Sequence, residues 1–247
     1  MNNVIQSLWI GDKLSQVERL CISSYIRNGH DFHLYAYNEI SGVPEGCSLK
    51  DANDILPESD VFSYKTGIGK GSFSAFSNYF RYKMLDLVGG WWTDTDVVCL
   101  RHLDIKDPFV FASEKTIDGE SHITSGIIKS TPASDFSKFC YQFCEEQNKE
   151  TLQWGTVGPR LVSDAVKSLN LQEYVKPWSF FNPIGFEQFG MLFDDSFGNI
   201  DFGESYTLHL WNEMWRRAGI NKNNQFPKDS ILDKLKTKYN ENSLPVR

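Results

Sequence analysis

Short apolar runs alternate with amphipathic segments along most of this 247-residue chain. Apolar residues at a period of two predict half-buried strands, and apolar residues three and four apart predict helices. Strands are expected at residues 4–10, 32–37, 97–100, 109–112, 123–128 and 206–211. Helices are expected at residues 14–25, 72–88, 136–147, 159–169 and 230–239. This alternation is typical of an α/β domain, in which helices cover the faces of a sheet.

Residues 41–71 interrupt the alternation with many Gly, Pro, Asp and Ser residues, which favour a loop with short helical turns. Elsewhere no internal repeat and no shift in composition marks a domain boundary. We therefore expect a single domain over residues 1–239 and a disordered tail at residues 240–247. With 40% hydrophobic residues, a chain of this length can bury a substantial core.

The composition argues against several classes of protein. A net charge of −7 without a basic stripe argues against nucleic-acid binding, which needs clustered Lys and Arg. The first residues hold no basic region followed by a long apolar stretch, so no signal peptide is expected, and no apolar window of about 18 residues predicts a membrane span. The five cysteines lack the spacing of a disulfide framework. Free thiols in a reducing cytoplasm are the favoured interpretation, over metal ligation.

The segment GGWWTDTDVVCL, residues 89–100, places two carboxylates directly before an apolar run. Aspartate disfavours strands, so Asp94 and Asp96 at a predicted strand start need an explanation. In a strand both side chains would point to the same side, where they would repel unless a cation lies between them. Carboxylate oxygens suit Mg²⁺ and Mn²⁺, which often bridge carboxylates to a diphosphate. A divalent metal site is one interpretation, and a solvated turn with two surface acids is the other.

The helix that precedes this segment carries a polar stripe beside an apolar one. Ser74, Asn78 and Arg81 are spaced four and three apart and therefore share one side of the helix. The apolar stripe, which is assigned to the core, consists of Phe73, Phe76, Phe80, Met84 and Leu87. Arginine could bond phosphate or sugar hydroxyls, and asparagine could bond hydroxyls as donor and acceptor. The alternative is that the polar stripe is merely solvated.

The segment SFSAFSNYFRYKMLDLVGGWWTDTDV, residues 72–97, resembles the pattern A-x-x-S-D-x-x-R-x-x-x-L-x-x-x-G-G-x-Y-x-D-x-D of a glycosyltransferase family. That family holds bacterial capsule and lipopolysaccharide sugar transferases, fungal mannosyltransferases and animal α-galactosyltransferases. Weaker similarity extends over most of the chain, in VIQSLWIG, WGTVGPRLV and LHLWNEMW. The resemblance implies the GT-A fold, a nucleotide-sugar-binding α/β fold with a mostly parallel central sheet flanked by helices.

The resemblance also implies an activity. The protein would be a hexosyltransferase that moves a sugar from a nucleotide sugar, UDP-linked, to a glycan or lipid-linked saccharide, with retention at the anomeric carbon. Its cofactor would be Mn²⁺ or Mg²⁺. Two other functions compete with this one: hydrolysis of nucleotide sugars, and nucleotide-sugar binding by a module that has lost turnover.

Individual roles follow from the same resemblance. Asp94 would contact the ribose or the donor sugar, Asp96 would bind the metal with His209 nearby, and Arg81 would hold the sugar or its diphosphate. The implied catalytic residues are Asp94, Asp96 and Arg81. The implied donor-binding residues are Trp9, Ser74, Asn78, Arg81, Asp94, Trp211 and Asn212. Trp9 and His209 could equally be core residues, and both interpretations stay open.

Two positions depart from the family pattern. Asn78 stands where aspartate is usual, which removes a charged contact to sugar hydroxyls and puts the identity of the donor in doubt. Trp92 replaces the usual tyrosine and keeps an aromatic wall. On the acceptor side Glu114 and Glu187 are candidate carboxylates, although each could be an ordinary polar residue.

The C-terminal part is rich in cations: Arg216, Arg217, Lys222, Lys228, Lys234, Lys236 and Lys238. Ile231, Leu232 and Leu235 could give the last helix an apolar edge, and cationic amphipathic helices can lie on anionic membranes. The expected location is the cytoplasm, with peripheral contact at the inner face of the membrane. The alternative is that this helix packs on the protein.

Overall fold

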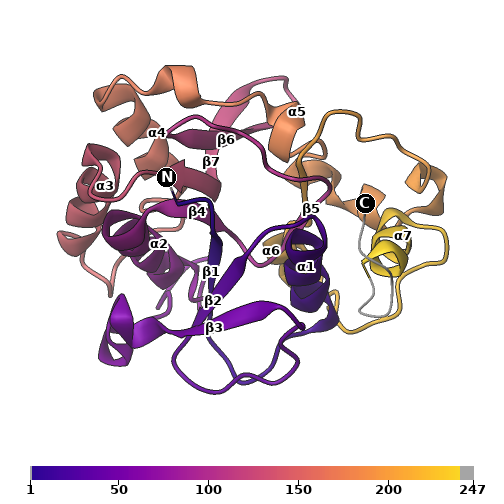
Figure 1. Ribbon diagram of the computed structural model, residues 1–247, viewed down its shortest axis with the longest axis horizontal. Helices are drawn as coiled ribbons and strands as arrows, with labels where there is room; N and C mark the ends of the chain where they lie inside the picture. The colour runs from indigo at the N-terminus through magenta and orange to yellow at the C-terminus, as the bar shows by residue number, and fades with distance from the viewer. Residues whose placement is uncertain (1, 240–247) are drawn as a thin grey trace.

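A computed structural model describes residues 2–239 as an α/β fold around a central sheet (Figure 1). Within these residues the sheet has six strands in the order β3-β2-β1-β4-β7-β6. Their bounds are β1 Ile5–Trp9, β2 Phe32–Ala36, β3 Cys47–Asp51, β4 Gly90–Thr93, β6 Val110–Lys115 and β7 Ser121–Ser130. The first four in this order are parallel, whereas β7 and β6 are antiparallel to their neighbours. The mostly parallel sheet of the expected GT-A fold is thus present.

Helices and a second sheet complete the described part of the chain. The second sheet pairs β5 (Val97–Cys99) with β8 (Thr207–His209) in antiparallel fashion. The α-helices are α1 Gln16–Arg27, α2 Ser74–Val88, α3 Asp135–Glu145, α4 Pro159–Ser168, α5 Trp178–Phe181, α6 Asn212–Arg217 and α7 Ile231–Lys238. The 3₁₀ helices are η1 Ala52–Asp54, η2 Glu58–Asp60, η3 Gln172–Tyr174, η4 Phe186–Phe193 and η5 Asp195–Phe197.

Successive side chains of the central strands pack on opposite faces of the sheet, as the pleat requires. Leu8 and Trp92 belong to a core shared with α2, α3 and α4, whereas Ile5 and Trp91 belong to a core shared with α1. Figure 1 shows α2 and α3 on one side of the sheet and α1 and α7 on the other. Because both faces are covered, these strands read as nearly continuous apolar runs in the sequence.

The ends of α1 and α2 follow local rules. Ser15 caps α1 and forms a capping box with Glu18, so two free backbone N–H groups of the first turn are satisfied. Helix α2 ends at Gly89, whose positive φ of 61° suits glycine and lets the chain turn directly into β4. A Cβ on Gly89 would also lie 2.6 Å from Pro132, so the turn has no room for a side chain. The turn sets where β4 begins, and the aspartates that come after β4 lie at the edge of the sheet.

Several details differ from the sequence prediction. Residues 41–71 contain a strand, β3, whose side chains are mostly exposed and which therefore lacks an apolar pattern. Phe73 and Leu87 are 41% and 47% exposed, so they do not belong to the core. Asn78 and Arg81 are only 7% and 3% exposed, so a merely solvated polar stripe is wrong. Asp94 and Asp96 do not start a strand but lie in the connection between β4 and β5.

The apolar edge expected for membrane contact is buried. Ile231, Leu232 and Leu235 are 2%, 0% and 7% exposed, and they pack in a core with α1, β5 and β8. The helix therefore packs on the protein, as the alternative had it. Among residues 2–239, no helix combines the length and the hydropathy needed to cross a bilayer.

Two expectations concern the thiols and the chain end. All five cysteines lie in the described part of the chain, and all five are free, as expected. The expected tail, residues 240–247, lies outside the described residues, and the single-domain organisation of residues 1–239 stays a prediction.

Candidate active site

The connection between β4 and β5 lies at the carboxyl edge of the parallel strands, where open α/β sheets bind ligands. The amide of Asp94 donates to the carbonyl of Gly126 on β7 (2.8 Å), which fixes the start of the connection. At its other end Val97 opens β5 and pairs with His209 of β8. Pairing of β5 with β8 thus brings His209 next to two aspartates that lie more than a hundred positions earlier in the sequence.

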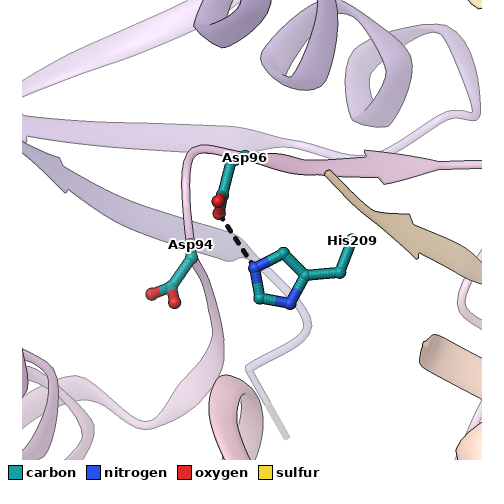
Figure 2. Close-up of side chains that lie close together, drawn as sticks. All are labelled: Asp94, Asp96 and His209. Carbon is teal, nitrogen blue, oxygen red and sulfur yellow. Dashed lines mark ion pairs between the residues drawn. The ribbon is translucent and has the colours of Figure 1, made fainter. Parts of the chain in front are cut away.

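Asp96 and His209 form the centre of the site (Figure 2). The Nε2 atom of His209 lies 3.2 Å from Oδ1 of Asp96, and the amide of Asn212 donates to the Oδ2 atom of Asp96 (2.8 Å). Burial raises the pKa of Asp96, but His209, the Asn212 amide and Lys222 outweigh it and bring the pKa to about 2. Asp96 is therefore an ionised carboxylate over the whole physiological range of pH.

Trp211 fixes the orientation of the histidine ring. The indole stacks on His209 with ring centroids 3.8 Å apart, and its Nε1 donates to the carbonyl of Ile184 (2.9 Å). Trp211 has a φ of 57°, a left-handed conformation that costs free energy in a residue of this size. Such strain persists where surrounding contacts impose it, commonly at functional sites.

Asp94 is held by Arg81 and Trp92. The guanidinium of Arg81 donates to Oδ1 of Asp94 (2.7 Å), and Trp92 Nε1 donates to the same oxygen (2.9 Å). Arg81 also lies over the Trp92 ring, 4.7 Å from its centroid, and donates to the carbonyl of Ser125. Burial raises the pKa of Asp94 above its usual range, whereas Arg81 acts in the opposite direction. Arg81 and Asp94 are thus brought together, and Trp92, the departure from the family tyrosine, bonds the aspartate directly.

Asp94, Asp96 and His209 can together hold a metal ion. Each offers one ligand atom, and these atoms lie within 4.8 Å of one another. Two carboxylates and an imidazole are suitable ligands for a divalent cation such as Mn²⁺. Burial and the neighbouring charge of Asp96 both raise the pKa of Asp94, so a cation would relieve an unfavourable arrangement. The residues present therefore fit the expected metal.

Gly126 lets the backbone of β7 approach this cluster closely. A Cβ on Gly126 would lie 3.3 Å from Oδ2 of Asp94 and 3.3 Å from Cε1 of His209. Asn78 stands beside another glycine: a Cβ on Gly158, at the start of α4, would lie 3.3 Å from its Nδ2 atom. The Oδ1 atom of Asn78 is buried without a hydrogen-bond partner, so its capacity to accept a hydrogen bond is unused.

Trp9 lies beside a cavity of about 210 Å³ at the ends of β1 and β2. The lining residues are Trp9, Ile10, Gly11, Tyr37, Asn38, Glu58 and Val61. The Nε1 atom of Trp9 is buried and has no hydrogen-bond partner. A flat aromatic side chain with polar neighbours is suited to a nucleobase, and Trp9 also packs against the core shared with α1, so both interpretations of Trp9 stay open.

Sequence reasoning missed two charged residues near Trp9. Lys222 lies 5.8 Å from the centroid of the Trp9 ring and forms an ion pair of 2.5 Å with Glu18, which is fully buried. Glu18 also accepts from Asn212 Nδ2 (3.4 Å), so this pair adjoins the Asp96 centre. In the sequence Lys222 is one of several C-terminal cations, and its distance of 204 positions from Glu18 leaves no local signal of their pairing.

Ser74 is the predicted donor-binding residue that the described contacts do not join to this cluster. Its hydroxyl accepts from Ser72 Oγ (3.2 Å) at the start of α2, one turn before Asn78.

Comparisons with known proteins show similarity in one region of the sequence and in the fold. Residues 15–117, which include Arg81, Asp94 and Asp96, match the family described as a glycosyltransferase sugar-binding region containing a DXD motif. The apo-form glycosyltransferase GlyE of Streptococcus pneumoniae TIGR4 is 13% identical, with a TM-score of 0.50 over 97% of this chain and 60% of that chain. The PaToxG glycosyltransferase is 16% identical, with a TM-score of 0.48 over 70% of this chain and 75% of that chain. This chain therefore spans less than two thirds of the GlyE chain.

The family match contains the Asp94–Asp96 motif, and the sheet places that motif at the ligand-binding edge of a GT-A type fold. Over residues 15–117 the chain is thus similar to the glycosyltransferases whose sugar-binding region contains a DXD motif.

Proposed function

We propose that this glycosyltransferase moves a hexose from a nucleotide sugar to a saccharide or lipid-linked acceptor, with retention of the anomeric configuration. The observation that carries the proposal is the convergence of Asp94, Asp96 and His209 at the carboxyl edge of the sheet. Uridine as the base and retention as the stereochemical outcome rest on the resemblance of residues 72–97.

Asp96 and His209 would hold the divalent metal, Mn²⁺ or Mg²⁺, with Asp94 beside them. When bound, such a metal supplies positive charge that neutralises the charge developing on the departing diphosphate. Asp96 is ionised and His209 is positioned by stacking on Trp211. Burial lowers the pKa of His209, but the neighbouring Asp96 and Asp94 outweigh burial and raise it, so metal binding would release a proton from the histidine.

Other side chains would bind the donor. Trp9 would stack on the base in its cavity. Lys222, a cation that lies over the Trp9 ring and lowers the pKa of Asp96, would face the diphosphate. Asn78, with an unpartnered Oδ1, would accept a hydrogen bond from a sugar hydroxyl. Arg81 would act mainly by holding Asp94 toward the sugar, since its guanidinium is already occupied by Asp94 and Ser125. These groups are fixed before the substrate binds, which is the main requirement for electrostatic catalysis.

The proposal is tested with a panel of nucleotide sugars in the presence of Mn²⁺. A true donor stabilises the folded protein by mass action, so it raises the melting temperature. Transfer to a panel of methyl hexosides then supports the proposal, whereas release of free sugar at the same rate with and without acceptor indicates a nucleotide-sugar hydrolase. Donor binding without any turnover indicates a non-catalytic module. Asp96→Ala is expected to abolish turnover and Mn²⁺ binding by calorimetry while the protein stays folded.

For location we propose the cytoplasm, where free thiols stay reduced, with peripheral contact at an anionic membrane. Because the apolar side of α7 is buried, this contact would be electrostatic and would involve exposed lysines such as Lys236 and Lys238. Co-sedimentation with anionic vesicles at low salt, lost at high salt, is the expected result. A protein that stays in the supernatant at low salt would contradict it.

A further inference from the structure

The wall of the site opposite the base cavity is formed by an irregular pair of strands. In the β6–β7 ladder Phe111 pairs with Ile128, but Ser113 pairs with Ile123. Two steps along β6 therefore face five steps along β7, so β7 bulges between these pairs. Bulges of this kind redirect side chains and are frequent next to active sites.

The bulge forms part of the active site. Its residue Gly126 accepts the amide of Asp94, and Ser125 accepts the guanidinium of Arg81. On the opposite strand the bulge is followed at once by Ser113 and Glu114. Glu114 thus follows, on β6, the irregular part of the ladder whose β7 residues Ser125 and Gly126 bond Arg81 and Asp94.

The backbone around Glu114 is well anchored. The hydroxyl of Ser113 donates to the carbonyl of Lys176 (2.7 Å), and Asn182 Nδ2 donates to the carbonyl of Ser113 (2.8 Å). Glu114 itself pairs with His122 across the ladder. The side chain is therefore presented from a rigid strand and not from a mobile loop.

One carboxylate oxygen of Glu114 is nevertheless unused. Its Oε2 atom is buried and has no hydrogen-bond partner, a state that costs free energy unless a ligand satisfies it. The nearby titratable groups are His209, His122 and Glu187. Burial raises the pKa of Glu114, and His209 acts on it in the opposite direction. Burial lowers the pKa of His209, but the charges of Asp96, Asp94 and Glu114 outweigh burial and raise it. Glu114 is therefore within electrostatic reach of the metal-site histidine.

Glu187, the other candidate carboxylate, has a structural contact. Its Oε2 accepts the amide of Ile117 (2.7 Å) at the tip of the β6–β7 hairpin, and its side chain lies in an exposed position. This bond fixes the hairpin tip and leaves no buried oxygen without a partner. The two glutamates therefore differ in their contacts: Glu187 bonds the hairpin tip, whereas Glu114 has a buried oxygen without a partner.

The order of strands indicates which substrate Glu114 faces. The base cavity lies at β1 and β2, the Asp94–Asp96 connection follows β4, and Glu114 is on β6 at the far edge of the sheet. A nucleotide sugar bound from the cavity toward Asp96 would place its sugar, and then the acceptor, in the direction of β6. Glu114 thus lies beyond the donor.

We propose that the carboxylate of Glu114 accepts a hydrogen bond from a hydroxyl of the saccharide acceptor and positions that acceptor beside the donor sugar. This inference rests on the proposed function. Hydroxyl groups bind carboxylates through short, charge-assisted hydrogen bonds, which suits a saccharide better than an apolar acceptor group. Occupation by the acceptor gives the buried Oε2 the partner that it lacks.

The test compares Glu114→Gln with Glu187→Gln, a matched control on the same wall whose amide oxygen can still accept from Ile117. Three quantities are measured with a UDP-hexose and Mn²⁺: donor affinity, release of free sugar without acceptor, and kcat/KM for methyl hexosides. In Glu114→Gln, kcat/KM for the acceptor falls about 10- to 100-fold, as expected for the loss of a charged hydrogen bond. Donor affinity and acceptor-free hydrolysis stay within about twofold, and Glu187→Gln resembles the wild type. The melting temperature of Glu114→Gln does not fall, because the substitution removes a buried charge whose Oε2 atom has no hydrogen-bond partner.

Three outcomes overturn the inference. A kcat/KM unchanged by Glu114→Gln shows that this carboxylate does not touch the acceptor. A loss of donor affinity or of acceptor-free hydrolysis as large as the loss of transfer places Glu114 on the donor side. Absence of transfer by the wild-type enzyme to any methyl hexoside, with donor hydrolysis intact, overturns the proposed function and this inference together.

Discussion

Removal of Arg81 should destabilise the protein as well as inactivate it. The Arg81 side chain is 4% exposed and donates to Asp94 over 2.7 Å, while Asp94 keeps only 29% of its side chain exposed. Arg81→Ala therefore leaves a largely buried carboxylate that has lost its cationic partner. Breaking a buried ion pair in this way typically costs 3–5 kcal/mol. Because Asp94 retains some exposure and the bond from Trp92, we expect the lower end, about 3 kcal/mol.

Arg101 provides a matched control. It forms an ion pair with Glu204 over 2.8 Å and lies over the Tyr206 ring at 4.2 Å, much as Arg81 lies over Trp92 at 4.7 Å. Its side chain and that of Glu204 are 37% and 85% exposed, so water screens the interaction. Exposed pairs contribute about 0–1 kcal/mol, and Arg101→Ala should lose no more than that. The two ion pairs then differ mainly in their burial, and burial accounts for most of the contrast between the two variants.

Urea unfolding in a chelating buffer measures both variants without a contribution from bound metal. The double variant Arg81→Ala/Asp94→Asn should recover part of the lost free energy of unfolding, because it also removes the Asp94 charge that Arg81→Ala leaves without a cation. The argument is refuted if Arg81→Ala loses less than about 1 kcal/mol, or if the effects of the two single substitutions add in the double variant.

Three further predictions concern the metal site, the base cavity and a buried histidine. Gly126→Ala should weaken Mn²⁺ binding about tenfold in calorimetry without lowering the melting temperature, whereas Gly190→Ala, at an open position with ordinary φ, should change neither. Trp9→Ala should weaken UDP binding about tenfold by loss of base stacking, and an unchanged Kd would exclude Trp9 from the base site. Burial and the neighbouring His102 lower the pKa of His30 from 6.5 to about 4, so the unfolded chain binds the extra proton and stability falls as pH drops from 6.5 to 4. The loss of unfolding free energy is up to about 3 kcal/mol, and His30→Gln should flatten it in urea titrations at several pH values.

The sequence predicted elements that are defined by buried apolar patterns and missed those that depend on distant partners. The apolar pattern does not predict β3, because its side chains are mostly exposed, and it does not predict α6, because this helix has only six residues. Helix α6 begins after the strained Trp211, and Asp96 accepts the amide of its first residue, Asn212. No local capping residue indicates such a helix, because the residue that accepts its first amide, Asp96, lies 116 positions earlier in the chain.

The site residues show the same difference between local patterns and contacts with distant residues. The pattern around Asp94 and Asp96 is local and was recognisable, and so was the neighbouring helix that carries Arg81. The ion pair between Glu18 and Lys222 and the anchored position of Glu114 were not recognisable, because each depends on how separate elements pack. Spacing along α2 favours a solvated Arg81, whereas in the fold Arg81 is buried in contact with Trp92 of β4 and Ser125 of β7.

The matched family region ends at residue 117, yet the site is completed by residues far beyond it. His209 reaches Asp96 because β8 pairs with β5, and Asn212 and Lys222 follow on the same C-terminal segment. The segment is fixed by α7, whose Ile231 and Leu232 are buried against it. Contacts that hold the C-terminal helices therefore also hold one proposed metal ligand and one proposed phosphate-facing cation. A substitution that loosens α7, such as Leu232→Ala, should accordingly weaken Mn²⁺ and nucleotide binding together, although Leu232 touches neither ligand. Weakened folding with unchanged affinity for both ligands would show that the C-terminal segment reaches the site independently of this helix.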